Sequence, residues 1–151
     1  PLNVGNMLEV HKALPHVALA SGERIYTRWG FRPFLEQHVL QVIQPDLTLC
    51  GGISETKKIC DMANIYDAAV QVHVCGGPLA TAATLQVEAV IPNFLIHEVH
   101  EGAIKQAMRE LGKYEDIKPV NGYYELPDRP GIGQELSQKA LDEAVNVYVC
   151  Q

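Results

Sequence analysis

The sequence has no uninterrupted apolar run that approaches the roughly 18 residues needed to cross a membrane. It also lacks a basic start that leads into an apolar stretch, so its beginning does not resemble a signal peptide. The chain starts with Pro1 rather than Met, and we therefore expect either processing or one piece of a longer protein. The sequence therefore predicts neither a membrane span nor a membrane partner.

Positive charge and cysteine are both scarce. Lys and Arg number 12 against 18 Asp and Glu, which gives a formal net charge of −6. A non-specific nucleic-acid binder needs a basic surface, so this balance argues against that class of protein. The spacing of the four cysteines matches no zinc motif, and a chain of 151 residues needs no disulfides. We therefore predict reduced thiols and a cytoplasmic location.

Short apolar runs alternate with segments of helical spacing along the first two thirds of the chain. The apolar runs predict strands at 17–22, 42–46, 68–73 and 93–98. The segments between them predict helices at 28–40, 51–66 and 78–91. This alternation is typical of a parallel sheet with crossover helices. It fits a doubly wound sheet or part of a (β/α)₈ barrel, and a full barrel needs about 250 residues.

The last third of the chain has a different pattern. Residues 101–111 predict a helix, and 117–133 are rich in Pro and Gly, which indicates extended chain with turns. Residues 136–145 predict another helix, with Ser137 as its N-cap. The apolar end at 146–150 is β-prone.

Each predicted strand ends on or next to an ionisable residue. These residues are Glu23, Asp46, His73 and Glu98. Barrel and open α/β enzymes place their chemistry at the carboxyl ends of parallel strands. One charged residue after a strand is usually the start of a solvated loop, but four in succession indicate a shared site.

The residue types at these strand ends suit proton transfer next to a carboxylate. Asp46 and His73 lie on consecutive strands, which are commonly neighbours, so the carboxylate can fix the tautomer of the imidazole. Glu23 is an oxygen ligand suited to Mg²⁺. Glu98 can hydrogen-bond a developing oxyanion. Together these residue types suit the formation of an enediolate that a metal stabilises.

Five stretches carry a resemblance to a known family. Overall, the sequence resembles the barrel domain of the enolase superfamily in the mandelate racemase/muconate lactonizing enzyme subgroup. Within that subgroup it is most similar to the sugar-acid dehydratases of the galactonate dehydratase type. The matching stretches are ASGERIYTRWGF (20–31), IQPDLTLCGGISETKKI (43–59), VHVCGGPLATAATLQ (72–86), IPNFLIHE (91–98) and NGYYELPDRPGIGQEL (121–136).

The resemblance implies a role for each strand-end residue. Glu23 corresponds to one of three carboxylate ligands of Mg²⁺. Asp46 and His73 correspond to the Asp–His dyad, whose histidine delivers a proton to the departing 3-hydroxyl group. Glu98 corresponds to the carboxyl group that hydrogen-bonds the substrate carboxylate opposite the metal. The implied substrate is a sugar acid such as galactonate or gluconate.

The resemblance also implies that much of the enzyme lies elsewhere. Residues 1–100 correspond to about strands five to eight, which is the C-terminal half of a TIM-like (β/α) barrel. Residues 101–151 correspond to a C-terminal extension that returns to a capping domain. The N-terminal capping domain, the first barrel half and two metal ligands are absent from this chain. We therefore expect the chain alone to be inactive, and to need its missing half or to form a homo-oligomer.

Two residues near the strand ends are weaker candidates for substrate binding. Arg24 can steer an anionic sugar acid, and His100 lies just past the last predicted strand. His97, Glu98 and His100 spell HEVH, but this spacing differs from that of the zinc protease motif.

Three alternative functions stay open. A racemase or epimerase would use His73 to exchange the α-proton on one face. A non-catalytic half-barrel would associate with another chain through its open strand edges. A cysteine hydrolase would use Cys75 with His73, which leaves the three carboxylates without a role.

Gly51 and Gly52 predict a tight strand-to-helix turn rather than a phosphate-binding loop.

Overall fold

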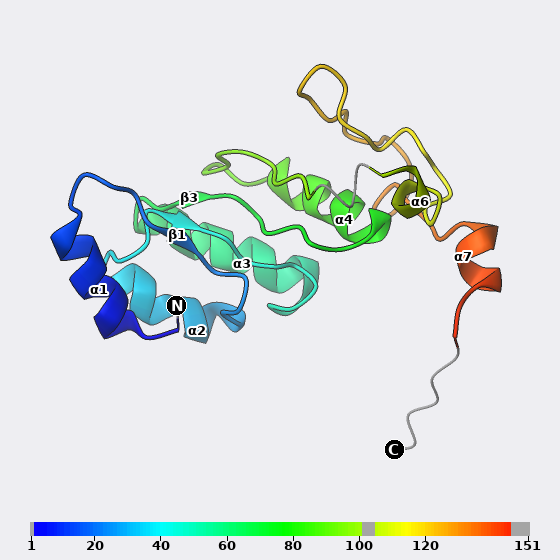
Figure 1. Cartoon of the computed structure of the whole chain (residues 1–151). Coiled ribbons are helices and arrows are strands. Elements are labelled where there is room, and N and C mark those ends of the chain that lie inside the picture. The colour runs from blue at the N-terminus through cyan, green and yellow to red at the C-terminus, as the bar shows by residue number, and fades with distance from the viewer. Residues whose placement is uncertain (1, 101–104, 146–151) are drawn as a thin grey trace.

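The computed structural model describes residues 2–100 and 105–145. It contains a three-stranded parallel sheet flanked by helices, followed by a long irregular segment that ends in a short helix (Figure 1). The elements are α1 (Val4–Ala13), β1 (Ala20–Ser21), α2 (Thr27–Glu36), β2 (Val42–Ile43), α3 (Gly52–Ile65), β3 (Ala69–Val70), α4 (Pro78–Glu88), α6 (Gln106–Arg109) and α7 (Gln138–Asp142).

The sheet has the parallel order that the alternating pattern predicts. Its strands lie in chain order, with Ile43 of β2 paired to Ser21 of β1 and to Val70 of β3. The segment at 93–98 joins the β3 edge through one parallel bridge, between Phe94 and Val70. The predicted alternation is confirmed, but this last segment is not a regular strand.

Regular pairing is shorter than predicted, since each strand is two residues long. The cause is visible between β2 and β3. Their pairing resumes at Asp46 and His73, which form an isolated parallel bridge. Pro45, which precedes Asp46, accepts a hydrogen bond from His73 N–H at 3.1 Å. As a proline it has no N–H to donate to the neighbouring strand in return. One rung is therefore missing, while the strand direction continues to the strand ends.

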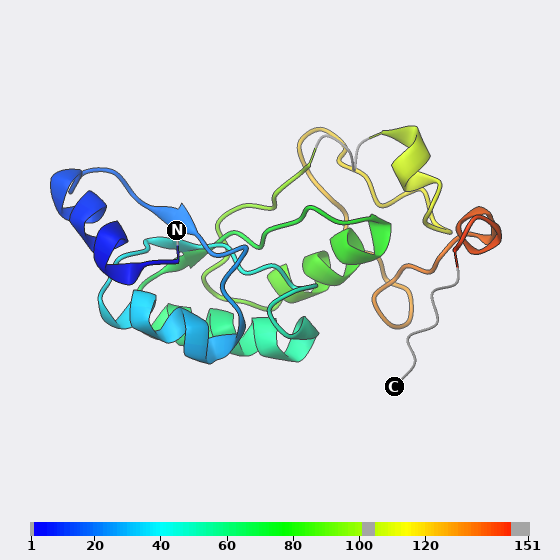
Figure 2. The ribbon, with the colours of Figure 1, turned by 60° about the horizontal axis from the view of Figure 1, so that its bottom comes forward.

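Helices α2, α3 and α4 lie on one side of the sheet (Figure 2). Ile43 and Val70 are fully buried on that side, whereas the alternating Val42 and Ala69 are partly exposed. Side chains alternate between the two faces of a strand. One face of the sheet is therefore packed against helices, and the other face is more open.

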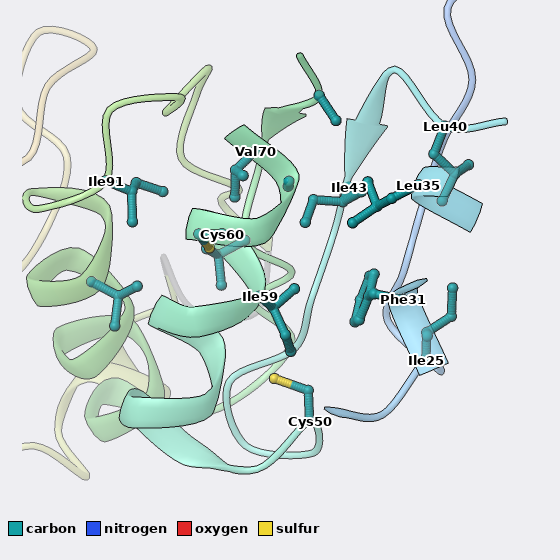
Figure 3. Close-up of a cluster of buried hydrophobic side chains, with 14 of the residues drawn as sticks. Ile25, Phe31, Leu35, Leu40, Ile43, Cys50, Ile59, Cys60, Val70 and Ile91 are labelled. Atoms are coloured by element: carbon teal, nitrogen blue, oxygen red, sulfur yellow. The ribbon is translucent and has the colours of Figure 1, made fainter. Parts of the chain in front are cut away.

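The core lies between this face and the helices. Figure 3 shows Phe31 and Leu35 of α2, Ile59 of α3, and Ile43 and Val70 of the sheet converging on it, and all five are 0% exposed. Phe31 and Leu35 are four residues apart, which places both on the same face of their helix. Burial of each such side chain stabilises the fold by roughly 1.5–3 kcal/mol.

Glycines shape two of the turns that precede helices. Gly51 and Gly52 have φ values of 124° and 81°, which favour glycine, and Gly51 is the N-cap position of α3. The predicted tight turn is confirmed. Gly22 lies where β1 ends, and a Cβ atom built there would be 2.7 Å from the backbone nitrogen of Gln44. Only glycine allows this close approach between the ends of β1 and β2.

Helix α1 was not predicted. None of its residues is buried, and its apolar positions at helical spacing, Val4, Met7 and Leu8, form only a short stripe. Its main local signal is Asn3, whose side chain caps the helix by accepting a hydrogen bond from Asn6 N–H at 2.9 Å. Val4 and Met7 are partly buried against the core, so tertiary packing adds to this cap.

The C-terminal part is less regular than the first part. The helix expected at 101–111 is observed only as α6, and residues 101–104 lie outside the described residues, as does the β-prone end at 146–150. Residues 117–133 contain no helix or regular strand, as predicted. Ser137 caps α7 by accepting a hydrogen bond from Ala140 N–H at 3.1 Å. None of the helices within residues 2–100 and 105–145 has the length and apolar content required to span a membrane.

Candidate active site

Asp46 and His73 form a direct side-chain contact at the carboxyl ends of β2 and β3. The Nδ1 atom of His73 lies 2.8 Å from Oδ2 of Asp46. This pairing continues the register in which Val42 lies beside Ala69. The two side chains are 24% and 9% exposed for His73 and Asp46, so the carboxylate is shielded while the imidazole still reaches solvent. The structure thus brings together the two residues that the strand order predicts to be neighbours.

Thr48, which the strand-end pattern did not single out, binds the second oxygen of Asp46. Both the backbone N–H, at 2.8 Å, and the hydroxyl group of Thr48 donate hydrogen bonds to Oδ1. An Asp followed two residues later by Thr at a strand end is a recognisable turn pattern in which the Asp side chain bonds the backbone ahead of it. That pattern was the available signal.

These contacts determine the ionisation of Asp46. Burial alone would raise its pKa, but hydrogen bonds from Thr48 and His73 outweigh that cost and hold the pKa below its ordinary value. An ionised Asp46 accepts a hydrogen bond from Nδ1–H of His73. This fixes the tautomer and leaves Nε2 as the atom through which the imidazole can exchange a proton.

Glu98 lies beside this pair. Its Oε2 atom accepts a hydrogen bond from the backbone N–H of Val74 at 2.9 Å, and Val74 follows His73 directly. The side chain of Glu98 is half-buried. The structure therefore connects the last predicted strand end to the strand end that carries the histidine.

Glu23 follows β1 at the same end of the sheet. Its Oε2 atom accepts a long hydrogen bond of 3.4 Å from Gly22 N–H, and the side chain is partly exposed. Arg24 and His100 are exposed in the segments that follow β1 and residues 93–98. These three residues lie at the expected strand ends, but the described contacts do not connect them to Asp46.

A complete magnesium site is not formed by this part of the protein. Within residues 2–100 and 105–145, no group of three or more His, Cys, Asp or Glu side chains could hold a metal ion. Glu23 offers one carboxylate, whereas Mg²⁺ requires near-octahedral oxygen coordination. The described residues therefore do not fit a resident Mg²⁺ by themselves.

The sequence and fold match a known protein family. The model of the family described as Enolase C-terminal domain-like matches residues 1–140. The chain belongs to the enolase superfamily. The mixed α/β architecture fits half of the TIM barrel of this superfamily, which decides between the two architectures that the sequence left open.

Individual members of the superfamily agree with this placement. The D-xylonate dehydratase of Haloferax volcanii is 37% identical over 129 residues, which are 82% of this chain and 30% of the relative. The crystal structure of a member of the enolase superfamily from Salmonella Typhimurium is 53% identical, has a TM-score of 0.90, and is matched over 95% of this chain and 36% of that chain.

A third relative carries the subgroup name. The structure of a mandelate racemase/muconate lactonizing enzyme from Sulfitobacter sp. is 35% identical with a TM-score of 0.83, and is matched over 91% of this chain and 33% of that chain. This superfamily member is thus similar to the sugar-acid dehydratases of the mandelate racemase/muconate lactonizing enzyme subgroup. It spans about a third of the length of these relatives.

Proposed function

We propose that this chain forms the C-terminal half of the barrel of a Mg²⁺-dependent sugar-acid dehydratase. Residues 1–100 supply the half-barrel, and residues 101–151 return toward an N-terminal capping domain that lies outside this chain. The observation that carries the proposal is the 2.8 Å contact between Asp46 and His73 at the strand ends. The coverage of about a third of each relative supports the assignment to one part of a longer enzyme.

In this proposal His73 is the general acid. Loss of water from a sugar acid removes the α-proton and the 3-hydroxyl group, and the hydroxyl leaves readily only when it is protonated. His73 delivers the proton from Nε2, so that the hydroxyl departs as water. Asp46 keeps Nδ1 protonated and stabilises the imidazolium before the transfer. The base that removes the α-proton lies outside this chain.

The remaining candidates bind the acid end of the substrate. Glu98 hydrogen-bonds the substrate carboxylate, and Arg24 and His100 contact the rest of the sugar acid from the rim. Glu23 supplies one carboxylate ligand to Mg²⁺, and the other ligands come from residues outside this chain. The substrate class is a sugar acid such as galactonate, gluconate or xylonate, the last of which appears in the name of a relative.

A racemase or epimerase is the second candidate. One relative is described as a mandelate racemase/muconate lactonizing enzyme, and the same dyad can return a proton to the α-carbon. A third candidate is a non-catalytic half-barrel that associates with another chain. Phe94, Leu95 and Ile96 are 45%, 55% and 57% exposed at the β3 edge of the sheet, and such an apolar edge favours association.

The proposal is tested with a panel of sugar acids and two protein samples. A longer polypeptide that contains this chain should release water from one or a few members of the panel and should require Mg²⁺. The purified chain of 151 residues should release water from no member of the panel. Titration calorimetry should detect no tight Mg²⁺ binding by it. Turnover by the purified chain at ordinary enzyme rates of about 1–10³ s⁻¹ would contradict the proposal.

A further inference from the structure

A second acid–imidazole pair lies on the helix side of the sheet, outside the proposed dyad. The Nδ1 atom of His97 is 2.6 Å from Oε2 of Glu88, the last residue of α4. The side chains are 10% and 4% exposed for His97 and Glu88. Both are more buried than the corresponding side chains of the dyad, so this pair contacts substrate poorly and requires another explanation.

Stability does not explain the pair. Glu88 places a carboxylate at the C-terminal end of a helix, where the helix dipole disfavours negative charge. Burial raises the pKa of Glu88, even though the contact with His97 and the backbone N–H of Val72 act in the opposite direction. Moreover, Nε2 of His97 is buried without a hydrogen-bond partner. Apolar side chains of similar volume are commonly as stable as such a buried pair, or more so.

The position of His97 links the pair to the proposed site. Its ring packs edge-on against Tyr124, with 4.9 Å between the ring centroids, so that α4 and the 117–133 segment both hold the side chain. The next residue is Glu98, whose carboxylate contacts Val74 N–H beside His73. Fixing the ring of His97 therefore restricts the backbone from which the Glu98 side chain extends.

We propose that Glu88 and His97 are positioning residues that hold the Glu98 carboxylate against the strand end of His73. Glu88 fixes the ring of His97 by its hydrogen bond. The peptide bond between His97 and Glu98 passes this restriction to the Glu98 backbone, so that the Glu98 side chain contacts the substrate carboxylate in a fixed position. The inference rests on the proposed function, in which Glu98 binds the substrate. It adds Glu88, the last residue of α4, to the residues on which that site depends.

The double replacement Glu88→Leu/His97→Phe separates positioning from stability. It substitutes an apolar pair that keeps an aromatic ring against Tyr124. In the longer protein we expect a melting temperature equal to or above that of the parent. We expect kcat for dehydration to fall about 10- to 100-fold, because small displacements of a binding group are costly to the reaction. A parental kcat in this stable variant would overturn the inference.

A conservative variant and a double-mutant cycle give the matched controls. Glu88→Gln keeps an oxygen that accepts from His97 Nδ1–H, and its kcat should stay within about threefold of the parent. If Glu88 acts through Glu98, the double replacement should cost little further activity in a Glu98→Gln background. An equal loss in both backgrounds would contradict the proposed route through Glu98.

A structural measurement distinguishes failure of this inference from failure of the proposed function. If the parent dehydrates no sugar acid, the proposed function fails before any variant is compared. The inference is then decided by the crystal structure of the double variant. We expect loss of the 2.9 Å contact between Glu98 Oε2 and Val74 N, and its retention would overturn the inference.

Discussion

Asp46 receives hydrogen bonds on both of its carboxylate oxygens, and one of its partners is His73. Thr48 binds Oδ1 through two donors, while Nδ1 of His73 lies 2.8 Å from Oδ2. The carboxylate therefore cannot rotate away from the imidazole without losing the Thr48 contacts. A rigid acceptor at Nδ1 keeps the histidine in a single tautomer, which a histidine that acts as a general acid requires.

Replacement of Asp46 by Asn should strongly reduce dehydration by the longer protein. Asn can still accept a hydrogen bond from Thr48, but its amide group presented to His73 favours the wrong tautomer. We expect kcat to fall by about 10²- to 10⁴-fold, by analogy with other Asp–His pairs. Asp61→Asn is the control, since Asp61 pairs with Lys57 on the exposed side of α3 and should change activity less than about twofold. Equal activity of both variants would exclude a catalytic dyad.

The acid stability of the chain should depend on the same carboxylate. The folded-state pKa of Asp46 lies below its ordinary value, so ionised Asp46 stabilises the fold above the unfolded-state pKa of about 3.9. This contribution is lost as the pH falls through the depressed folded-state pKa. Between about pH 6 and pH 3 the melting temperature of the parent should therefore fall more steeply than that of Asp46→Asn. Parallel curves for the two proteins would contradict this assignment of the pKa shift.

Two isoleucines on α3 give a matched test of the core. Ile59 is 0% exposed and Ile65 is 79% exposed, so the same substitution removes the same atoms from opposite environments. Ile59→Ala should lower the free energy of unfolding by about 2–5 kcal/mol. Ile65→Ala should change it by less than about 0.5 kcal/mol. Urea denaturation measures both, and similar losses would show that the helix packs differently.

Two glycines with positive φ angles test the close approach of β1 and β2. A Cβ atom at Gly22 would lie 2.7–2.8 Å from backbone atoms of Gln44, whereas none lies within 4 Å of a Cβ atom at Gly52. Both Ala variants suffer backbone strain, and Gly22→Ala adds a steric clash. Gly22→Ala should therefore lower the free energy of unfolding by about 1–3 kcal/mol more than Gly52→Ala does. Equal losses of unfolding free energy would show that Gly22 lies farther from Gln44 than it does in this structure.

Local patterns predicted those parts of the site that depend on strand order. Short apolar runs followed by Asp46 and His73 sufficed to place these residues side by side, because consecutive parallel strands are commonly neighbours. The glycine turn before α3 was also predictable, since two adjacent glycines favour a positive φ. In both cases the signal lies within a few residues of the feature.

Other features depend on contacts that no local pattern encodes. Glu88 and His97 are nine residues apart and belong to different segments, so their pairing follows from how α4 packs on the sheet. The apolar stripe of helix α1 is short, and none of its residues is buried. Regular pairing between β2 and β3 stops early because Pro45 has no N–H to donate. Composition and periodicity do not report these tertiary effects.

Deuterium exchange at the α-carbon of the sugar acid, measured in D₂O with the His73→Asn variant of the longer protein, tests the general-acid role most directly. Loss of the imidazole should abolish release of water, because the 3-hydroxyl group is no longer protonated, while the opposite-face base still removes the α-proton. We predict abolished dehydration with retained α-proton exchange. Loss of both activities would identify His73 as the base instead, and unchanged dehydration would contradict a catalytic role for His73.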